Sequence, residues 1–291
     1  MSESVRIAGV QMNVAFADPE TNLQRMEAAM AEARQAGAHL AIFPECALAG
    51  YCFESLDECR PYAEPVPGPA TQRMAATAKR LGMYAVFGLL ESDGDRIFNA
   101  CCLVGPNGVV GNYRKVHLPY LGIDRFTTPG DRGFAVHDAG GLKVGMNICY
   151  DGAFPEAARV MALEGADVIV LPTNWPPGAE CTAECVIAAR ALENAVYYAA
   201  VNRVGVERGF PFIGKSKVCD PSGHVIASAE PPTEAIFYAD LDLQRARNKH
   251  IIRVPGKHEI NRFADRHPEF YGRVLAPVAV RRPPIGGGGE L

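Results

Sequence analysis

Short apolar runs alternate with amphipathic stretches along this chain of 291 residues. The amphipathic stretches, with apolar positions three or four residues apart, predict helices, the first of them with Asp18 as its N-cap. The predicted helices cover residues 19–36, 69–81, 156–163 and 180–194. The apolar runs predict buried strands at residues 5–12, 39–43, 84–90, 142–148, 167–171 and 195–203. This alternation of strands and helices is typical of a layered α/β fold.

Two hairpins are predicted where turn residues separate short strands. The turn sequence GPNG joins residues 98–104 to residues 108–115. The turn sequence DPSG joins residues 215–219 to residues 224–228. Proline, asparagine and glycine favour tight turns, so both segments are expected to reverse the chain direction.

The two halves of the chain share a faint internal similarity. Residues 33–45, ARQAGAHLAIFPE, parallel residues 162–173, ALEGADVIVLPT. In each, a Gly-Ala pair ends a helix and an apolar strand then runs into a proline. We interpret this as two βαβαβ halves related by a pseudo-twofold axis, each giving one sheet. The same order of elements is common in α/β proteins, so the similarity concerns the architecture alone.

Cys149 follows the apolar strand at residues 142–148, shortly before a predicted helix. Open parallel sheets place their ligand sites at such strand-to-loop junctions, which makes Cys149 a candidate nucleophile. The alternative is a core thiol, because free cysteine is among the most buried residue types.

A carboxylate and an ammonium group also lie near predicted strand ends. Glu45 follows Pro44, which cannot donate to a sheet ladder, so pairing is expected to stop there. Lys115 lies at the centre of a short extended run that ends in a proline. Each charge by itself is more typical of a solvated surface. Together with Cys149, the two supply the base, cation and nucleophile of covalent acyl transfer.

Three motifs around these residues resemble the carbon–nitrogen hydrolase (nitrilase) superfamily. They are FPE at 43–45, YRKVHLP at 113–119 and NICYDGAFPEAAR at 147–159, with support from PTNW at 172–175 and from residues 202–223. The resemblance covers about residues 5–245. It implies a four-layer αββα sandwich and a catalytic triad of Glu45, Lys115 and Cys149. It also implies chemistry through a thioester that requires no metal and no organic cofactor.

The resemblance also guides the assignment of the other site residues. The family commonly has a further acidic residue beyond the lysine, and Asp124 is the candidate here. Asp124 is about one methylene shorter than the usual glutamate, and capping of its loop is the alternative role. We expect His117 to make a structural hydrogen bond. Four residues near the motifs are expected to contact the substrate: Tyr150, Asn174, Trp175 and Tyr120.

The residues after the cysteine bear on which bond is cut. Tyr150 and Asp151 resemble the amidase and carbamoylase branches, whereas members that hydrolyse nitriles typically have Trp-Glu. Carbamoylases acting on amino acids often carry an arginine where this chain has Gly152 and Ala153, so this loop lacks a bidentate carboxylate anchor. We expect an amidohydrolase for a small linear amide or N-carbamoyl (ureido) compound. The alternatives are a nitrilase and an amide acyltransferase that uses the same triad.

Charge around the pocket leads to an expectation about the substrate. Asp124, Glu156 and Glu180 are expected to surround it with negative charge and to favour a distal ammonium group. The competing hypothesis is a carboxylate held by an arginine from elsewhere in the chain. The candidates are Arg125, Arg159 and Arg190.

Composition argues against several other classes of protein. A net charge of −4 and a pI near 6.0 give no basic footprint for nucleic acid. Nine cysteines with no CxxC pair favour neither a disulfide framework nor a zinc site. Cys181 and Cys185, one helical turn apart, are assigned to core packing or a pocket wall. The start of the chain lacks the form of a signal peptide, and no apolar run approaches the roughly 20 residues of a membrane span. We expect a cytoplasmic protein.

No linker-like segment divides the chain, so we expect one hydrolase domain over residues 1–272. Within it, residues 240–243 and 262–271 resemble the family's final strand and its usual ending. Residues 273–291 are rich in proline and glycine and cannot form a core of their own. Because the family's subunits pair and homodimers are the commonest closed assembly, this tail is predicted to be an arm in a homodimer or larger homo-oligomer.

Overall fold

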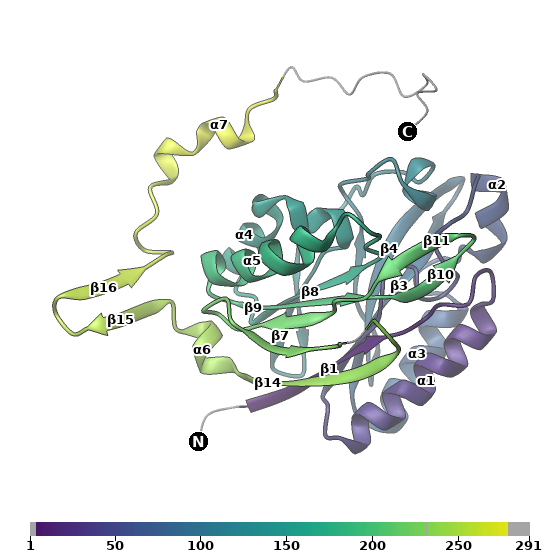
Figure 1. Cartoon of the computed structure of the whole chain (residues 1–291), viewed down its shortest axis with the longest axis horizontal. Coiled ribbons are helices and arrows are strands. Elements are labelled where there is room, and N and C mark those ends of the chain that lie inside the picture. Colours follow the sequence, from purple (N-terminus) through teal and green to yellow (C-terminus); the bar gives the residue numbers. More distant parts are fainter. Residues whose placement is uncertain (1–3, 231, 279–291) are drawn as a thin grey trace. The chain divides into compact units, whose positions relative to one another are not determined.

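Two six-stranded sheets form the centre of the fold in the computed structural model, which describes residues 4–230 and 232–278 (Figure 1). The first sheet has the strand order β14-β1-β2-β3-β4-β5. Its strands are β1 (Ser4–Gln11), β2 (Leu40–Ile42), β3 (Tyr84–Asp93), β4 (Arg96–Gly105), β5 (Gly108–Arg114) and β14 (Ala235–Asp242). Strands β1, β2 and β3 are parallel, and the others join antiparallel.

The second sheet repeats this plan with the order β13-β12-β9-β8-β7-β6. Its strands are β6 (Val136–Ala139), β7 (Leu142–Met146), β8 (Val168–Thr173), β9 (Tyr197–Asn202), β12 (Lys217–Cys219) and β13 (Val225–Ser228). The central strands β7, β8 and β9 are parallel, as β1, β2 and β3 are. The structure thus has the two related halves that the internal similarity predicts.

Helices cover the outer faces of the two sheets and complete the predicted αββα arrangement (Figure 1). On the first sheet lie α1 (Pro19–Gln35) and α3 (Pro69–Leu81). Asp18 caps α1 as predicted, accepting a hydrogen bond from the Thr21 N–H at 3.1 Å. On the second sheet lie α4 (Pro155–Leu163) and α5 (Ile187–Asn194). The helix predicted at residues 180–194 is wound as a π-helix, η4 (Thr182–Val186), before α5 begins.

Several shorter elements lie in the connections. They are α2 (Leu56–Cys59), η1 (Arg60–Tyr62), η2 (Gly122–Arg125), η3 (Cys149–Ala153) and α6 (Leu243–Arg247). A further hairpin, β10 (Val204–Glu207) with β11 (Phe210–Ile213), lies beside the sheets and is absent from the sequence prediction. Its strands have four residues each and Pro211 interrupts the second, so the usual alternation is too short to recognise.

Pro172 lies inside β8, whereas the sequence pattern predicts that it ends the strand. It pairs with Val201 of β9, and β8 continues to Thr173. Strand β7 pairs with β8 only as far as Val170. The missing N–H of Pro172 therefore removes no ladder bond on the β7 side, which relaxes the usual exclusion of proline from central strands.

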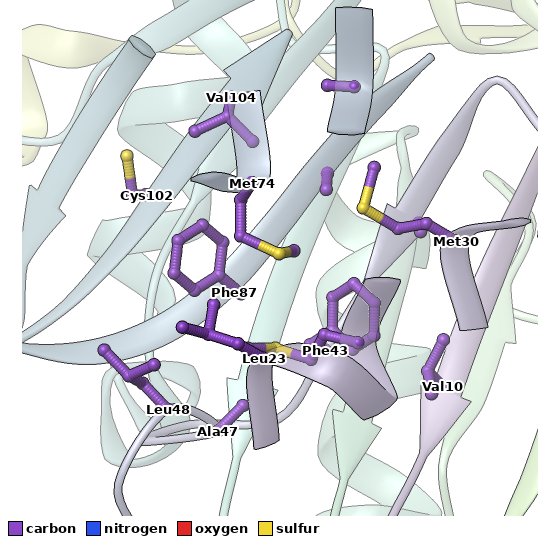
Figure 2. Packing of buried hydrophobic residues seen from close by; sticks show 14 of the residues in the cluster. Val10, Leu23, Met30, Phe43, Ala47, Leu48, Met74, Phe87, Cys102 and Val104 are labelled. Atoms are coloured by element: carbon purple, nitrogen blue, oxygen red, sulfur yellow. The ribbon is translucent and has the colours of Figure 1, made fainter. Parts of the chain in front are cut away.

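A large buried cluster fills the space between the first sheet and its two helices. Leu23 and Met30 of α1 and Met74 of α3 pack with Phe43 and with Phe87 of β3 (Figure 2). Interlocking side chains of this size exclude water and bring the dispersion contacts of a close-packed interior. This packing fixes the end of β2, from which the chain turns into the loop that carries Glu45.

Residues 250–278 belong to a second compact unit. It contains β15 (His250–Val254), β16 (His258–Asn261), η5 (Pro268–Phe270) and α7 (Gly272–Leu275). His250 and Glu259 make an ion pair at 2.8 Å across its hairpin. The predicted domain boundary after residue 272 falls inside α7, and most of the predicted tail lies outside the described residues. The subunit arm stays a prediction.

None of the helices in residues 4–230 and 232–278 combines the length and the apolar character that crossing a bilayer requires. The cytoplasmic location stays a prediction.

Replacing Phe43 by alanine should destabilise the fold strongly. The ring is fully buried in the cluster between the first sheet and helices α1 and α3. Removing it leaves a cavity that rigid neighbours fill only in part. We expect the free energy of unfolding to fall by about 3–5 kcal/mol. Urea denaturation followed by circular dichroism measures this change. Val206→Ala, at a position that is 63% exposed, is the control and should change it by less than about 0.5 kcal/mol. An equal loss in both variants would contradict the assignment of the core.

Candidate functional site

The three residues singled out by their motifs all lie just beyond strands of the two sheets. Glu45 follows β2, and Lys115 directly follows β5. Cys149 opens the short helix η3, three residues after the end of β7. The parallel strands at the centre of each sheet end at this edge, so the two halves contribute their loops to one place.

A buried ion cluster joins two of these residues to Asp124. Lys115 Nζ lies 2.7 Å from Glu45 Oε1 and 2.5 Å from Asp124 Oδ2. All three side chains are completely buried. Asp124 reaches the lysine despite its short side chain because η2 lies close to the cluster, held by a hydrogen bond from the Ile123 N–H to the Tyr51 carbonyl oxygen. The aspartate is therefore a member of the cluster.

Asn99 of β4 is a site residue that the sequence motifs do not reveal. Its Nδ2 amide donates to Glu45 Oε1 at 2.7 Å and to Asp124 Oδ1 at 2.8 Å. The amide thus bridges the two carboxylates, and its oxygen accepts a weak hydrogen bond from the Cys46 thiol at 3.6 Å. The signal available in the sequence is a lone amide inside an otherwise apolar strand.

Tyr51 is a second contributor that no periodic pattern marks. Its hydroxyl lies 2.8 Å from Asp124 Oδ2 and is completely buried. The backbone of this loop is fixed by buried Glu207, whose carboxylate accepts from the N–H groups of Tyr51 and Cys52 at 2.7 and 2.6 Å. Glu207 is itself paired with Arg203. Residues far apart in the sequence therefore hold the tyrosine against the cluster.

The turn that carries Cys149 has a strained backbone and a rigid support. Cys149 has φ +45°, in the left-handed region that side chains other than glycine rarely adopt. Asp151 accepts from the Ile148 N–H at 2.9 Å and from the Tyr113 hydroxyl at 2.8 Å. The same carboxylate lies 2.7 Å from His117 Nδ1, the structural hydrogen bond predicted for that histidine. Strain of this kind persists only where the surroundings determine it, and it clusters at functional sites.

The protonation state of the cysteine is set mainly by its burial. Burial, and next the Glu45 carboxylate, raise the pKa of Cys149 to about 12. Three groups act in the opposite direction and favour the thiolate: the Lys115 ammonium, the Thr173 side chain and the Asn174 backbone N–H. The resting group is a thiol at neutral pH, and the groups that stabilise its anion are already in place.

The charged cluster has shifted pKa values with identifiable causes. Burial raises the pKa of Glu45, and the ammonium group of Lys115 opposes part of that effect. Burial alone would lower the pKa of Lys115, but Asp124 and Glu45 together raise it well above its usual range. Lys115 therefore stays positively charged, while Glu45 gains a proton more readily than an exposed glutamate.

Polar atoms without a protein partner mark where a ligand fits. Within the described part of the chain, Glu45 Oε2 and both amide atoms of Asn174 are buried and make no hydrogen bond. A buried polar atom without a partner costs about 1–3 kcal/mol, so native structures rarely keep several together. A donor and an acceptor on Asn174 and a free oxygen on Glu45 suit a small polar molecule beside Cys149.

The remaining predicted substrate contacts differ in their exposure. Trp175 is buried, and its backbone N–H donates to Asn202 Oδ1 at 2.8 Å. Tyr150 is 39% exposed and follows the cysteine in η3. Tyr120 is 59% exposed and lines a pocket of about 280 Å³ whose wall includes Tyr51. Among the residues that the structure describes, no group of three or more acidic, histidine or cysteine side chains is arranged to hold a metal ion.

Two other cysteines change the picture drawn from the sequence. Cys181 and Cys185 are exposed, so the core packing expected for them is wrong. They lie at the start of the π-helical turn, where the side chains that face the sheet are instead Ala183 and Ile187, both fully buried. Four-residue spacing predicts that the two thiols lie on the same side of the helix. It does not show whether the rest of the protein covers that side.

Comparison with known proteins finds relatives over most of this chain. The profile of the carbon-nitrogen hydrolase family matches residues 6–250. A nitrilase from Pyrococcus abyssi is 41% identical over 274 residues, which cover 92% of this chain and 100% of that protein. An omega-amidase from Homo sapiens is 31% identical over 255 residues, which cover 83% of this chain and 90% of that protein.

Solved structures agree with the sequence matches. A double mutant of the amidase from Nesterenkonia sp. AN1, in complex with acrylamide, has a TM-score of 0.77 and 25% identity over 93% of this chain and 97% of that one. The glutamate and cysteine replaced in that mutant are 104 positions apart, as are Glu45 and Cys149. Another structure of that amidase carries acrylamide added at its active-site cysteine, with a TM-score of 0.73 and 27% identity. The chain described here belongs to the carbon–nitrogen hydrolase family and is a hydrolase of carbon–nitrogen bonds.

Proposed function

We propose that this enzyme hydrolyses a non-peptide C–N bond of a small linear amide or N-carbamoyl compound through a thioester on Cys149. One observation carries the proposal: a fully buried Lys115 lies between Glu45 and Asp124, at the edge where Cys149 opens a strained turn. Burying three charges is unfavourable unless every group is paired. Shifted pKa values and backbone strain in one place favour a catalytic role.

In the first step, the Cys149 sulfur attacks the carbonyl carbon of the amide. Glu45 takes the thiol proton, and its free Oε2 is the natural acceptor because Oε1 already bonds Lys115 and Asn99. The tetrahedral intermediate then collapses, Glu45 gives the proton to the departing nitrogen, and ammonia or an amine leaves. The raised pKa of Glu45 suits it to accept the thiol proton, because a carboxylate with a raised pKa is a stronger base than an exposed one.

The negative oxygen of the intermediate needs donors that are in place beforehand. Lys115 supplies a permanent positive charge, since its pKa is raised well above the usual range. The backbone N–H of Tyr150, next to Cys149 in η3, is the second donor in our proposal. Each such donor is worth about 3 kcal/mol of transition-state stabilisation in enzymes of this kind.

Water completes the cycle by attacking the thioester carbon. Glu45 now takes a proton from the water, the C–S bond breaks, and the proton returns to the Cys149 sulfur. The product is a carboxylic acid from an amide, or a carbamic acid from an N-carbamoyl compound. Each step moves one proton through the same carboxylate, so Asp124, which is tied to Lys115 and Asn99, holds the cluster and need not exchange protons.

Two alternatives use the same residues. In a nitrilase, the thiol attacks a nitrile carbon, and the similarity to a protein named nitrilase favours including this reaction. In an acyltransferase, an amine intercepts the thioester instead of water. An ammonia-release screen over amides, ureido compounds and nitriles separates the first alternative. Product analysis with added hydroxylamine separates the second.

The contacts of the charged residues favour an anionic substrate over the cationic one expected from the sequence. The charge of Asp124 is offset by Lys115, and Glu180 accepts from the Gly178 N–H. Arg125 lines the pocket beside Tyr51. Its guanidinium donates to carbonyl oxygens at 2.9 and 3.2 Å, and no carboxylate in residues 4–230 or 232–278 pairs with it. A substrate carboxylate would complement this charge, in keeping with relatives named omega-amidase.

The other candidate arginines have structural partners. Arg190 donates to the carbonyl oxygens of Gly152 and Ala153 at 3.0 and 3.2 Å, at the end of the turn that carries the cysteine. Arg159 donates to the Glu193 carbonyl oxygen at 2.7 Å. Arg190 also pairs with the Glu193 carboxylate at 2.9 Å. Of the three, Arg125 lines the pocket of Tyr51 and Tyr120, so it is the one that we assign to the substrate.

Gly88 of β3 sets how closely the Glu45 loop approaches the sheet. A Cβ atom there would lie 2.3 Å from the Cys46 nitrogen and 2.7 Å from Glu45 Cα. Both are backbone atoms, so no side chain can turn aside to relieve the overlap. Any side chain at Gly88 must push the general base away from the cysteine.

Cys149→Ala should abolish turnover without unfolding the protein, because the variant loses the attacking sulfur and little else. Wild-type enzyme quenched in acid with substrate should carry the acyl group on Cys149, detected by peptide mass spectrometry. Cys46→Ala is the matched control, since Cys46 is a buried thiol directly after Glu45 and should retain a measurable rate. Turnover by Cys149→Ala would remove the cysteine from the mechanism.

Gly88→Ala should lower kcat by about 100-fold with a much smaller effect on KM, because displacement of a catalytic group by about 1 Å has that order of effect. Gly133→Ala is the control, since a Cβ there has no neighbour within 4 Å. Steady-state kinetics of both variants, with circular dichroism to verify folding, test the prediction. A folded Gly88→Ala enzyme with the wild-type rate would show that Glu45 need not be held in this position.

Among amides of equal length, we expect kcat/KM to be highest for an ω-carboxy amide, intermediate for a neutral amide and lowest for an ω-amino amide. Arg125→Gln should lower the value for the carboxy amide by about 10-fold or more, the worth of one charge-assisted hydrogen bond, and leave the neutral amide nearly unchanged. Arg34→Gln, on the exposed face of α1, is the control. A preference for the ω-amino amide would restore the cationic hypothesis.

A further inference from the structure

A second pair of sulfur atoms lies outside the catalytic cluster, on the surface of the helical segment before α5. Cys181 and Cys185 are both exposed and both free. Cys181 is the N-cap of the π-helix η4, and Cys185 lies within it. Single π-helical turns are rare and occur frequently at functional sites, so this winding is an observation independent of the two thiols.

The helix geometry brings the two thiols within bonding distance. Residues four apart on a helix have Cα atoms about 6 Å apart, within the range of roughly 4.4–6.8 Å that disulfides span. The wider π turn sets positions i and i+4 more nearly above one another than an α-helix does. The side chains of Cys181 and Cys185 already share a hydrogen bond, which raises the pKa of Cys185.

Exposure favours reactivity at this pair over the buried cysteines. The pKa of Cys185 is raised, chiefly by its contact with Cys181 and next by desolvation and the Glu184 carboxylate, and Lys217 opposes part of that rise. Lys215 pairs with Glu184 at 2.6 Å and offsets that negative charge. Cys149, by contrast, is buried and has a pKa of about 12, which keeps it a protonated thiol. Oxidants act on exposed thiolates, so the exposed pair is the more accessible target.

Two connections join the thiol pair to the proposed nucleophile. The π-helix η4 packs directly against η3, the turn that begins with Cys149. The chain also runs in seven residues from Asn174 to Cys181, and the Asn174 N–H is a hydrogen-bond donor to the Cys149 sulfur. A change in the winding of η4 therefore affects both the turn η3 and the Asn174 N–H, which support Cys149.

We propose that Cys181 and Cys185 form an oxidisable dithiol site, which a hydroperoxide closes to an intrahelical disulfide. The Cys181 thiolate attacks the peroxide oxygen, the O–O bond breaks, and an alcohol or water leaves as Cys181 becomes a sulfenic acid. The Cys185 sulfur then displaces hydroxide from the Cys181 sulfur, and water leaves as the S–S bond forms. The two thiols lose two electrons and two protons, and the peroxide takes up both.

The disulfide fixes η4 in one geometry and so restrains η3, which slows the reaction at Cys149. This consequence rests on the proposed function of Cys149, whereas the disulfide itself does not. The disulfide is detected by the mass of the peptide that contains it, and its effect on Cys149 is measured as the rate of turnover. Reduction by a dithiol should reverse both, because no atom other than hydrogen is lost.

Tryptic peptides of the full-length enzyme distinguish the two kinds of cysteine. Trypsin is expected to release residues 160–190 with Cys181 and Cys185, and residues 144–159 with Cys149 alone. After treatment with hydrogen peroxide and alkylation, peptide 160–190 should be lighter by two hydrogen atoms and unalkylated, and peptide 144–159 should be alkylated in full. Two alkylated thiols in peptide 160–190, or oxidation confined to Cys149, would overturn the proposal.

Rates of the variants test the coupling. Peroxide should lower wild-type turnover about fivefold, the lower end of typical couplings between sites, and leave the rate of Cys181→Ser unchanged. Cys219→Ser, which replaces a buried thiol outside the pair, is the matched control and should respond like wild type. An equal loss of rate in Cys181→Ser would place the sensitive group elsewhere. A disulfide that forms without any change in rate would refute the coupling to η3.

Discussion

The whole site depends on one buried ammonium group. Lys115 lies in the interior with two carboxylates within 2.7 Å, and removal of either carboxylate would leave a charge without full compensation. In proteins such a loss is worth about 3–5 kcal/mol. The surrounding structure supplies further donors: Asn99 bridges both carboxylates, and the Tyr51 hydroxyl donates to Asp124. The lysine is thereby held charged, as a donor to an oxyanion must be.

The same cluster explains how one carboxylate can serve as both base and acid. Burial raises the pKa of Glu45, and Lys115 limits that rise, so the group accepts a proton more readily than an exposed glutamate does. One oxygen of Glu45 is fixed by Lys115 and Asn99, and the other makes no hydrogen bond to the described residues. Orientation and reactivity are thus divided between the two oxygens of a single side chain.

The nucleophile's turn has a different kind of support. Cys149 has an unfavourable φ, and the Asp151 carboxylate, the two carbonyl contacts of Arg190 and the packing of η4 all restrain η3. Strain held by several contacts can be released by changing one of them. That is the physical reason why a covalent bond in η4 is expected to reach the cysteine, although neither thiol of the pair lies in the catalytic cluster.

The sequence by itself determined the alternating elements, the two related halves and the positions of Glu45, Lys115 and Cys149. Strand ends, prolines and helix caps act locally, so their residues carry the signal. Asn99 and Tyr51 became site residues only in the tertiary structure, because their partners lie 25 to 73 positions away. The exposure of Cys181 and the continuation of β8 through Pro172 were likewise decided by neighbours: which helix side is covered, and where the adjacent strand stops. Local patterns specify elements, whereas burial and pairing depend on what the fold brings beside them.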